Sequence, residues 1–235
     1  MSPLLPKLVL LPGMDGTGRL WADFIAALPK GFEAQAVQYP TDRCLSYAEL
    51  GEIVRDAAPD SETFVLVAES FSSPLAIQYA ATKPPNLRGL VICAGFAASP
   101  VHGWRRYLVL FLAPILFRMP LPNLAARCFL VGRDPRPSLL AAVRSAVSSV
   151  QPRVLASRVR AILACDARAE LGQVAAPILY LKASQDRLVG SSCLEEIERI
   201  KPTVAVASIT GPHLLLQREP QQAGEVVARF VYQLG

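Results

Sequence analysis

Six short apolar runs, each followed by a longer amphipathic stretch, constrain the fold of this chain more than any other feature of its sequence. Runs of this length, bounded by turn residues, are typical of buried strands. They cover residues 8–11, 34–38, 64–68, 87–93, 178–182 and 204–209. Strands that alternate with helices predict an α/β fold, here a sheet of about six mostly parallel strands with helices on both faces.

The stretches between the runs carry helix signals. Trp21 and Phe24 are three residues apart, as on one face of a helix. Ser46 and Glu49 have the spacing of a capping box, in which each side chain accepts a hydrogen bond from the other residue's backbone N–H. Pro220 is suited to the first turn of a last helix. We therefore expect crossover helices between the early strands and a final helix packed on the sheet.

The alternation fails in residues 98–170, where helical patterns and several prolines occur without a convincing strand. This pattern predicts a helical insertion into a core built from residues 1–97 and 171–235. Ligands of open α/β sheets bind beyond the carboxyl ends of the strands. Because the insertion leaves one strand end and returns to the next strand, we expect it to lie over the site as a cap or lid.

Positive charge is concentrated in this insertion. The chain of 235 residues has a net charge of +5, yet between Gly103 and Arg168 there are eleven arginines against only Asp134 and Asp166. Such a surface is either a solvated face or a docking surface for an acidic partner. No stacking aromatics and no recognisable nucleic-acid module accompany the charge, so we expect no nucleic-acid partner.

Apolar length and cysteine spacing bear on the compartment. The longest apolar stretch, residues 107–117, is interrupted by Pro114 and has about half the length that a transmembrane helix needs. The first apolar run continues into Pro12 and Gly13 without a cleavage site of small residues, which favours a strand over a signal peptide. Five scattered cysteines indicate neither a disulfide framework nor a zinc site. We expect a cytoplasmic protein with no transmembrane segment.

Ser70 follows the third apolar run, within the sequence AESFS of residues 68–72. This turn resembles the nucleophile elbow of the α/β-hydrolase family, usually written G-x-S-x-G. Small residues are needed two positions before and two after the nucleophile because the turn is tight, and here Ala68 and Ser72 replace the two glycines. The structural alternative is that Ser70 only caps the following helix.

A glycine-rich loop, LPGMDGTG at residues 11–18, follows the first run. In the α/β-hydrolase family this loop supplies one backbone N–H of the oxyanion hole, and the residue after the nucleophile supplies the other. The resemblance therefore implies Met14 and Phe71 for these two roles. A glycine loop can also bind a phosphate, but the order of the glycines differs from the dinucleotide fingerprint and the lysine of a P-loop is missing.

Histidine is scarce, since only His102 and His213 occur. A serine nucleophile needs a nearby base, and imidazole is the usual one. His213 comes just after the last run, whereas His102 lies at the start of the insertion. Asp186 follows the fifth run, so Ser70, Asp186 and His213 occur in the order of the α/β-hydrolase triad. The resemblance implies a nucleophile, an orienting acid and a general base in that order, with no metal and no organic cofactor.

The substrate is less constrained, because this triad serves many substrates on one fold. We expect a serine carboxylesterase that hydrolyses small-molecule esters of short or medium acyl chains through an acyl-enzyme. The basic, capped architecture is similar to that of pimeloyl-acyl-carrier-protein methyl esterases, which implies an acidic carrier protein as an alternative partner. Thioester hydrolysis and acyl transfer belong to the same alternative, the latter because residues 11–18 look like the plant phytyl ester synthase group. A non-catalytic ligand-binding protein and a membrane-surface role for the insertion are further alternatives.

Overall fold

The computed structural model describes residues 5–119 and 121–234. Six strands form one sheet in which every neighbouring pair is parallel. In chain order they are β1 (Lys7–Leu11), β2 (Ala34–Ala36), β3 (Phe64–Glu69), β4 (Leu87–Cys93), β5 (Ile178–Ala183) and β6 (Ala205–Ile209). Across the sheet they lie in the order β2-β1-β3-β4-β5-β6. Each strand coincides with one of the six apolar runs, so the predicted parallel α/β architecture is confirmed.

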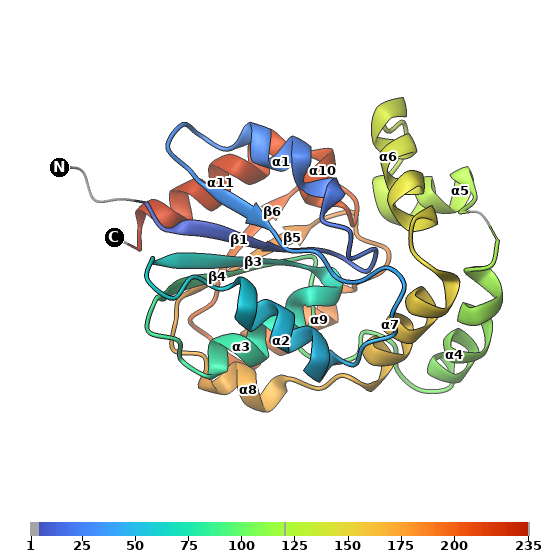
Figure 1. Ribbon diagram of the computed structural model, residues 1–235, viewed down its shortest axis with the longest axis horizontal. Helices are drawn as coiled ribbons and strands as arrows, with labels where there is room; N and C mark the ends of the chain where they lie inside the picture. The colour runs from blue at the N-terminus through green and yellow to red at the C-terminus, as the bar shows by residue number, and fades with distance from the viewer. Residues whose placement is uncertain (1–4, 120, 235) are drawn as a thin grey trace.

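Helices cover both faces of the sheet (Figure 1). One face is covered by η1 (Arg19–Trp21), α1 (Ala22–Ala27), α10 (Leu215–Arg218) and α11 (Pro220–Tyr232). The other face is covered by α2 (Tyr47–Ala57), α3 (Ser73–Ala81), α8 (Arg168–Gln173) and α9 (Ser191–Ile200). The capping box of Ser46 and Glu49 is present at the start of α2, as predicted.

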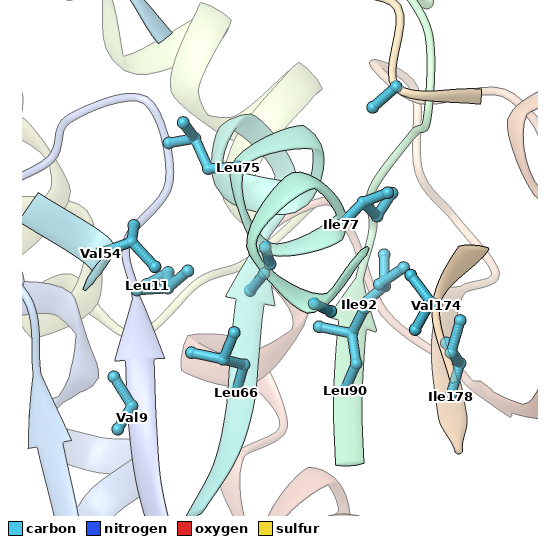
Figure 2. Close-up of a cluster of buried hydrophobic side chains, with 14 of the residues drawn as sticks. Val9, Leu11, Val54, Leu66, Leu75, Ile77, Leu90, Ile92, Val174 and Ile178 are labelled. Carbon is cyan, nitrogen blue, oxygen red and sulfur yellow. The ribbon is translucent and has the colours of Figure 1, made fainter. Parts of the chain in front are cut away.

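Apolar side chains fill the space between the sheet and each helix layer. In Figure 2, Leu66 and Leu90 of the neighbouring strands β3 and β4 lie beneath the helix that carries Leu75. Val65, one residue before Leu66, belongs to the cluster on the opposite face, together with Val227 of α11. Successive residues of a strand point to opposite faces, and the central strands β1, β3 and β4 are therefore apolar on both faces along most of their length.

The chain changes direction across the sheet at β1. Strand β2 pairs with one side of β1 and β3 pairs with the other side. The loops that follow β1 and β3 consequently lead to helices on opposite faces, which leaves a crevice between them at the carboxyl edge of the sheet. This is the edge at which the sequence places Ser70.

The chain between β4 and β5 carries additional helices: α4 (Arg105–Leu116), α5 (Asn123–Ala125), a π-helical stretch η3 (Ala126–Val131), α6 (Pro137–Ser148) and α7 (Pro152–Ala164). An isolated antiparallel bridge between Ala98 and Asp166 closes the base of this region. We call residues 99–165 the helical segment. Figure 1 shows it beyond the ends toward which the strands point. Helix α8, which follows it, packs on α3 beside the sheet.

The helical segment has small apolar clusters of its own. One cluster joins Leu139 and Val143 of α6 to Leu20 and Leu214 of the core. Another joins Ala113 of α4 to α7. Within the two described ranges, no helix has both the length and the apolar character required to cross a membrane.

Candidate active site

Ser70 lies in a strained turn at the carboxyl edge of the sheet. Strand β3 ends at Glu69, and a single 3₁₀ turn, η2 (Ser70–Ser72), leads directly into α3. The backbone of Ser70 has a φ of 46°, in the left-handed region that residues other than glycine rarely adopt. Ala68 and Ser72 are completely buried, as the tight turn requires. Strain of this kind is typical of the nucleophile elbow and is held by the surrounding structure.

The structure brings Asp186 and His213 close to Ser70. His213 Nε2 lies 2.9 Å from Ser70 Oγ, and His213 Nδ1 lies 2.7 Å from Asp186 Oδ2. Because a carboxylate only accepts, the Nδ1–H donates to Asp186, which leaves Nε2 free to accept the Ser70 hydroxyl proton. The His213 and Asp186 side chains are 6 % and 5 % exposed, so water has little access to this hydrogen-bonded chain.

Backbone groups fix the Asp186 carboxylate. Its Oδ1 accepts hydrogen bonds from the N–H groups of Leu188 and Val189, at 2.8 Å and 3.0 Å. The second oxygen, Oδ2, is therefore directed to His213. The other histidine, His102, lines a separate hollow with Cys193 and Glu196.

Met14 and Phe71 lie on the two loops that flank the crevice, after β1 and β3. Met14 is a central residue of a turn that is closed by the Gly16 N–H donating to the Gly13 carbonyl, at 3.0 Å. Phe71 is in the first turn after a strand, where backbone N–H groups have no partner within the helix. Its ring stacks on Tyr47 at a centroid distance of 5.0 Å, and the Tyr47 hydroxyl donates to the Phe71 carbonyl at 2.9 Å.

Ser72 ties these two loops together. Its hydroxyl donates to the Pro12 carbonyl at 2.5 Å and accepts from the Tyr39 hydroxyl at 2.8 Å. Ser72 is completely buried, so both bonds are protected from water. The small residue that replaces the second glycine of the elbow thus has a bonding role, which goes beyond the fit that its size provides.

Arg158 of α7 is a site residue that the sequence analysis missed. Its side chain is 2 % exposed and reaches from the helical segment to the loop after β1. The guanidinium donates to the carbonyls of Met14, Asp15 and Pro40, at 2.9 Å, 2.6 Å and 2.9 Å. Burial lowers the pKa of Arg158, and the nearby Asp15 partly opposes that shift. Its position on the buried stripe of α7, three residues after Leu155, was the available signal.

Glu69 is a second buried ionisable group that the sequence analysis did not single out. It is 1 % exposed, directly before Ser70, and Gln217 Nε2 donates to its Oε2 at 3.3 Å. Burial raises the pKa of Glu69 to about 7, against the opposing effects of His213 and of hydrogen bonds from Gln217 and Gly13. An acidic residue that ends a fully apolar strand is the pattern that could have revealed it.

Two hollows lie beside the histidine and aspartate loops. The larger, of about 1090 Å³, is polar and includes Asp186 and four arginines in its wall, Arg127, Arg133, Arg187 and Arg218. The other, of about 890 Å³, is mainly apolar and lies largely within the helical segment. Both have the volume of a small-molecule site.

The walls of the apolar hollow are connected to all three loops of the site. Leu188 belongs to the loop that holds Asp186, and Leu155 is one helical turn from Arg158. The carbonyl of Leu130 accepts the N–H of Leu214, the residue after His213. The proposed catalytic residues themselves, Ser70, Asp186 and His213, are not among the residues that line this hollow.

A scan of the sequence against models of protein families and a search of curated proteins gave no match. Solved structures do match. A hydrolase from Oleispira antarctica has a TM-score of 0.83 and 14 % identity, covering 97 % of this chain and 91 % of that chain. An esterase from Thermogutta terrifontis has a TM-score of 0.82 and 15 % identity, covering 97 % and 90 %. A bromoperoxidase from Bacillus anthracis has a TM-score of 0.83 and 15 % identity, covering 97 % and 92 %.

These likenesses show that the chain has the α/β-hydrolase fold, which the sequence resemblance implied. Identities of 14 % and 15 % show the fold alone. These three proteins carry out different reactions by name, and one fold serves many activities, so the activity of this chain depends on its own residues.

Proposed function

We propose that this chain is a serine carboxylesterase with Ser70 as nucleophile, His213 as general base and Asp186 as the orienting acid. The observation that carries the proposal is the continuous chain of hydrogen bonds from Asp186 through His213 to Ser70, at 2.7 Å and 2.9 Å. The hydrolase and the esterase among the solved structures of this fold support the same reaction class.

The reaction proceeds in two steps. Ser70 Oγ attacks the acyl carbonyl while its proton moves to His213 Nε2, and the imidazolium is stabilised by Asp186. The ester C–O bond then breaks, the leaving oxygen takes the proton from His213, and the acyl group stays on Ser70. Water attacks this acyl-enzyme with His213 again as base, which releases the acid and restores the serine. We assign the backbone N–H groups of Met14 and Phe71 to the developing oxyanion.

The apolar hollow supplies a site for the acyl chain. It is lined by aliphatic and aromatic side chains such as Phe117, Leu121 and Phe129, and Leu188 of its wall is two residues from Asp186. In this proposal the helical segment acts as a cap that forms the acyl pocket. Short and medium acyl chains remain the expected substrates.

A carrier-bound acyl group is the second candidate substrate. The observation in its favour is the polar hollow next to the Asp186 loop, whose wall contains four arginines (Arg127, Arg133, Arg187 and Arg218) and three acidic residues (Asp134, Asp186 and Glu219). An anionic leaving group or carrier would be attracted by the arginines, which outnumber the acidic residues by one. Faster turnover of an acyl-carrier-protein ester than of the corresponding free ester would favour this candidate.

The test is hydrolysis of p-nitrophenyl esters from acetate to palmitate by the wild type, Ser70→Ala and Ser184→Ala. Ser184 is an exposed serine in the neighbouring Asp186 loop and serves as the matched control. We expect turnover with one preferred chain length in the wild type and in Ser184→Ala, and none in Ser70→Ala. Equal turnover by the wild type and Ser70→Ala would contradict the proposal.

A further inference from the structure

Helix α4 exposes an apolar stripe along its whole length. Trp104, Tyr107, Phe111 and Ile115 follow one another at intervals of three or four residues and are 71 %, 69 %, 72 % and 50 % exposed. Such spacing places them on one side of the helix. On the other side, Ala113 is buried against α7. Helices that are apolar all round are normally buried all round. Within the described residues, one side of α4 therefore has no partner.

The apolar surface continues to the mouth of the apolar hollow. Leu116, Met119, Phe129 and Leu188 are each between 44 % and 56 % exposed, and all four line that hollow. Exposed apolar surface of this extent marks an interaction site in proteins. A partner that covered α4 would also cover the entrance to the proposed acyl pocket.

The charge around this surface selects the kind of partner. Arg105 and Arg106 lie at the start of α4 and Arg118 lies just after its end. Residues 99–165 contain ten arginines, of which Arg158 is buried and Arg136 pairs with Asp23, and a single acidic residue, Asp134. A second copy of the chain, paired through the same face, would bring these arginines against one another, because such pairing is self-complementary. An anionic surface has the opposite charge.

We infer that α4 docks this protein on an anionic lipid surface, with the aromatic stripe in the interface and the arginines against the lipid phosphates. An apolar helical face flanked by arginines, with tryptophan and tyrosine at one end, has the composition of helices that lie in the membrane interface. The inference rests on the proposed function in one respect only: docking brings lipid esters to the mouth of the proposed acyl pocket. The docking itself requires no catalysis.

The experiment measures sedimentation of the full chain with vesicles of phosphatidylglycerol and of phosphatidylcholine, at low and at high salt. A Ser70→Ala background prevents lipid hydrolysis from altering the vesicles. We expect binding to the anionic vesicles that weakens with salt and drops at least about ten-fold in Trp104→Glu/Phe111→Glu. The control is Tyr232→Glu, which introduces a glutamate at another exposed aromatic, 56 % exposed and the last residue of α11. Figure 1 shows α11 on the opposite side of the molecule from α4.

Separate measurements distinguish the possible failures. Hydrolysis of a water-soluble ester, measured with Ser70 intact, should be unchanged in Trp104→Glu/Phe111→Glu, so the esterase and the docking surface are tested independently. Equal sedimentation of the double variant and its parent, or a preference for neutral vesicles, would overturn the inference. A wild-type dimer that the double variant converts to a monomer would also overturn it, because a second copy then covers α4.

A different observation carries a second inference, which concerns Arg158 and rests on the proposed function. The two central carbonyls of the turn at residues 13–16, those of Met14 and Asp15, are both held by one guanidinium from α7. The same guanidinium lies over the Phe71 ring, with its carbon 6.0 Å from the ring centroid. A single side chain thus contacts both residues assigned to the oxyanion hole.

The geometry points to Arg158 as a positioning residue that sets the direction of the Met14 N–H through the turn. Its partners are carbonyls, and a guanidinium can serve several of them at once because its donors are fixed in one plane. Gly16 leaves room for this contact, since a Cβ there would lie 2.5 Å from an Arg158 nitrogen.

Arg158→Met and Arg158→Lys test this role, with Arg160→Met as control because Arg160 is exposed on the same helix. We expect Arg158→Met to lower kcat about 10- to 100-fold with little change in KM, and Arg158→Lys to restore part of it. Affinity for a trifluoromethyl ketone, which forms a tetrahedral adduct with the serine, should fall in parallel with kcat. If the wild type is active and the folded Arg158→Met variant has the same kcat, the assignment of Arg158 is overturned. An inactive wild type would instead contradict the proposed function.

Discussion

The loops at the carboxyl ends of the strands and the helical segment differ in what holds their side chains in place. At the carboxyl ends of the strands, Asp186 and His213 are held by the short loops that follow β5 and β6. In the helical segment, Phe111 is largely exposed while Arg158 is buried. The difference lies in what supports each region. The edge loops are fixed by the sheet beneath them, whereas the helical segment is held by small apolar clusters and a few contacts such as those of Arg158.

This contrast separates the chemistry from the surface that surrounds it. The proposed nucleophile, base and acid all follow strands of the sheet, and none comes from the helical segment. The segment contributes the lining of the apolar hollow, the Arg158 contact and the exposed face of α4. Substitutions at the edge should therefore stop the reaction, and substitutions in the segment should alter rate, selectivity or binding by smaller factors.

The largest effect is expected from Asp186→Asn. The amide no longer favours the His213 tautomer that accepts the serine proton, so kcat should fall on the order of 10³- to 10⁴-fold. Stopped-flow or steady-state ester hydrolysis measures the loss, and circular dichroism establishes that the variant is folded. If Asp186→Asn lowered kcat less than Arg158→Met does, the helical segment would contribute more to the reaction than the loops that follow the strands, contrary to this account.

Truncation of an apolar residue to alanine should have very different effects in the two regions. Leu66 in β3 is completely buried, and Leu66→Ala should lower the free energy of unfolding by about 2–5 kcal/mol through lost burial and a cavity. Phe111→Ala should change it by less than about 0.5 kcal/mol, because that side chain is 72 % exposed. Urea denaturation of both variants provides the values. A comparable loss at both positions would show that α4 is packed on both sides.

Glu69, at the carboxyl end of β3, makes a pH-dependent contribution to the stability of the fold. Burial raises its pKa from 4.5 to about 7, so between these pH values the folded protein binds a proton that the unfolded chain has released. The contribution of Glu69 to the free energy of unfolding is complete below about pH 4.5. It is lost as the pH rises through about 7, and the total loss is on the order of 3 kcal/mol. Unfolding of the wild type and of Glu69→Gln, compared across this range, should show that the variant lacks this loss. If the free energies of unfolding of the two proteins changed with pH in parallel, Glu69 would not be the group responsible.

The smallest effect is expected from the ion pair that joins α6 of the helical segment to α1 of the core. Arg136 and Asp23 are 3.0 Å apart, and their side chains are 51 % and 53 % exposed. Exposed pairs of this kind stabilise by about 1 kcal/mol or less, so Asp23→Asn should alter the free energy of unfolding within that limit. A larger change in urea denaturation would mean that charge, more than apolar packing, attaches the segment to the core.

The sequence was sufficient to predict the strands, because each of the six falls on an apolar run. Ser70, Asp186 and His213 come after three of these strands in a recognisable order, which led to their proposal as site residues. Arg158 could not be assigned in this way, because its hydrogen bond to Asp15 joins residues 143 positions apart. A membrane-surface role for the insertion stayed an alternative in the sequence analysis, since the apolar pattern of α4 is also compatible with a buried helix.

The central claim is that Ser70 forms a covalent intermediate with the aid of His213. Reaction of the full chain with a fluorophosphonate, followed by intact mass and peptide mapping, tests it most directly. The account predicts one adduct per chain, located on Ser70, absent in Ser70→Ala and greatly slowed in His213→Ala. An adduct on another serine, or no adduct on a folded wild-type chain, would contradict it.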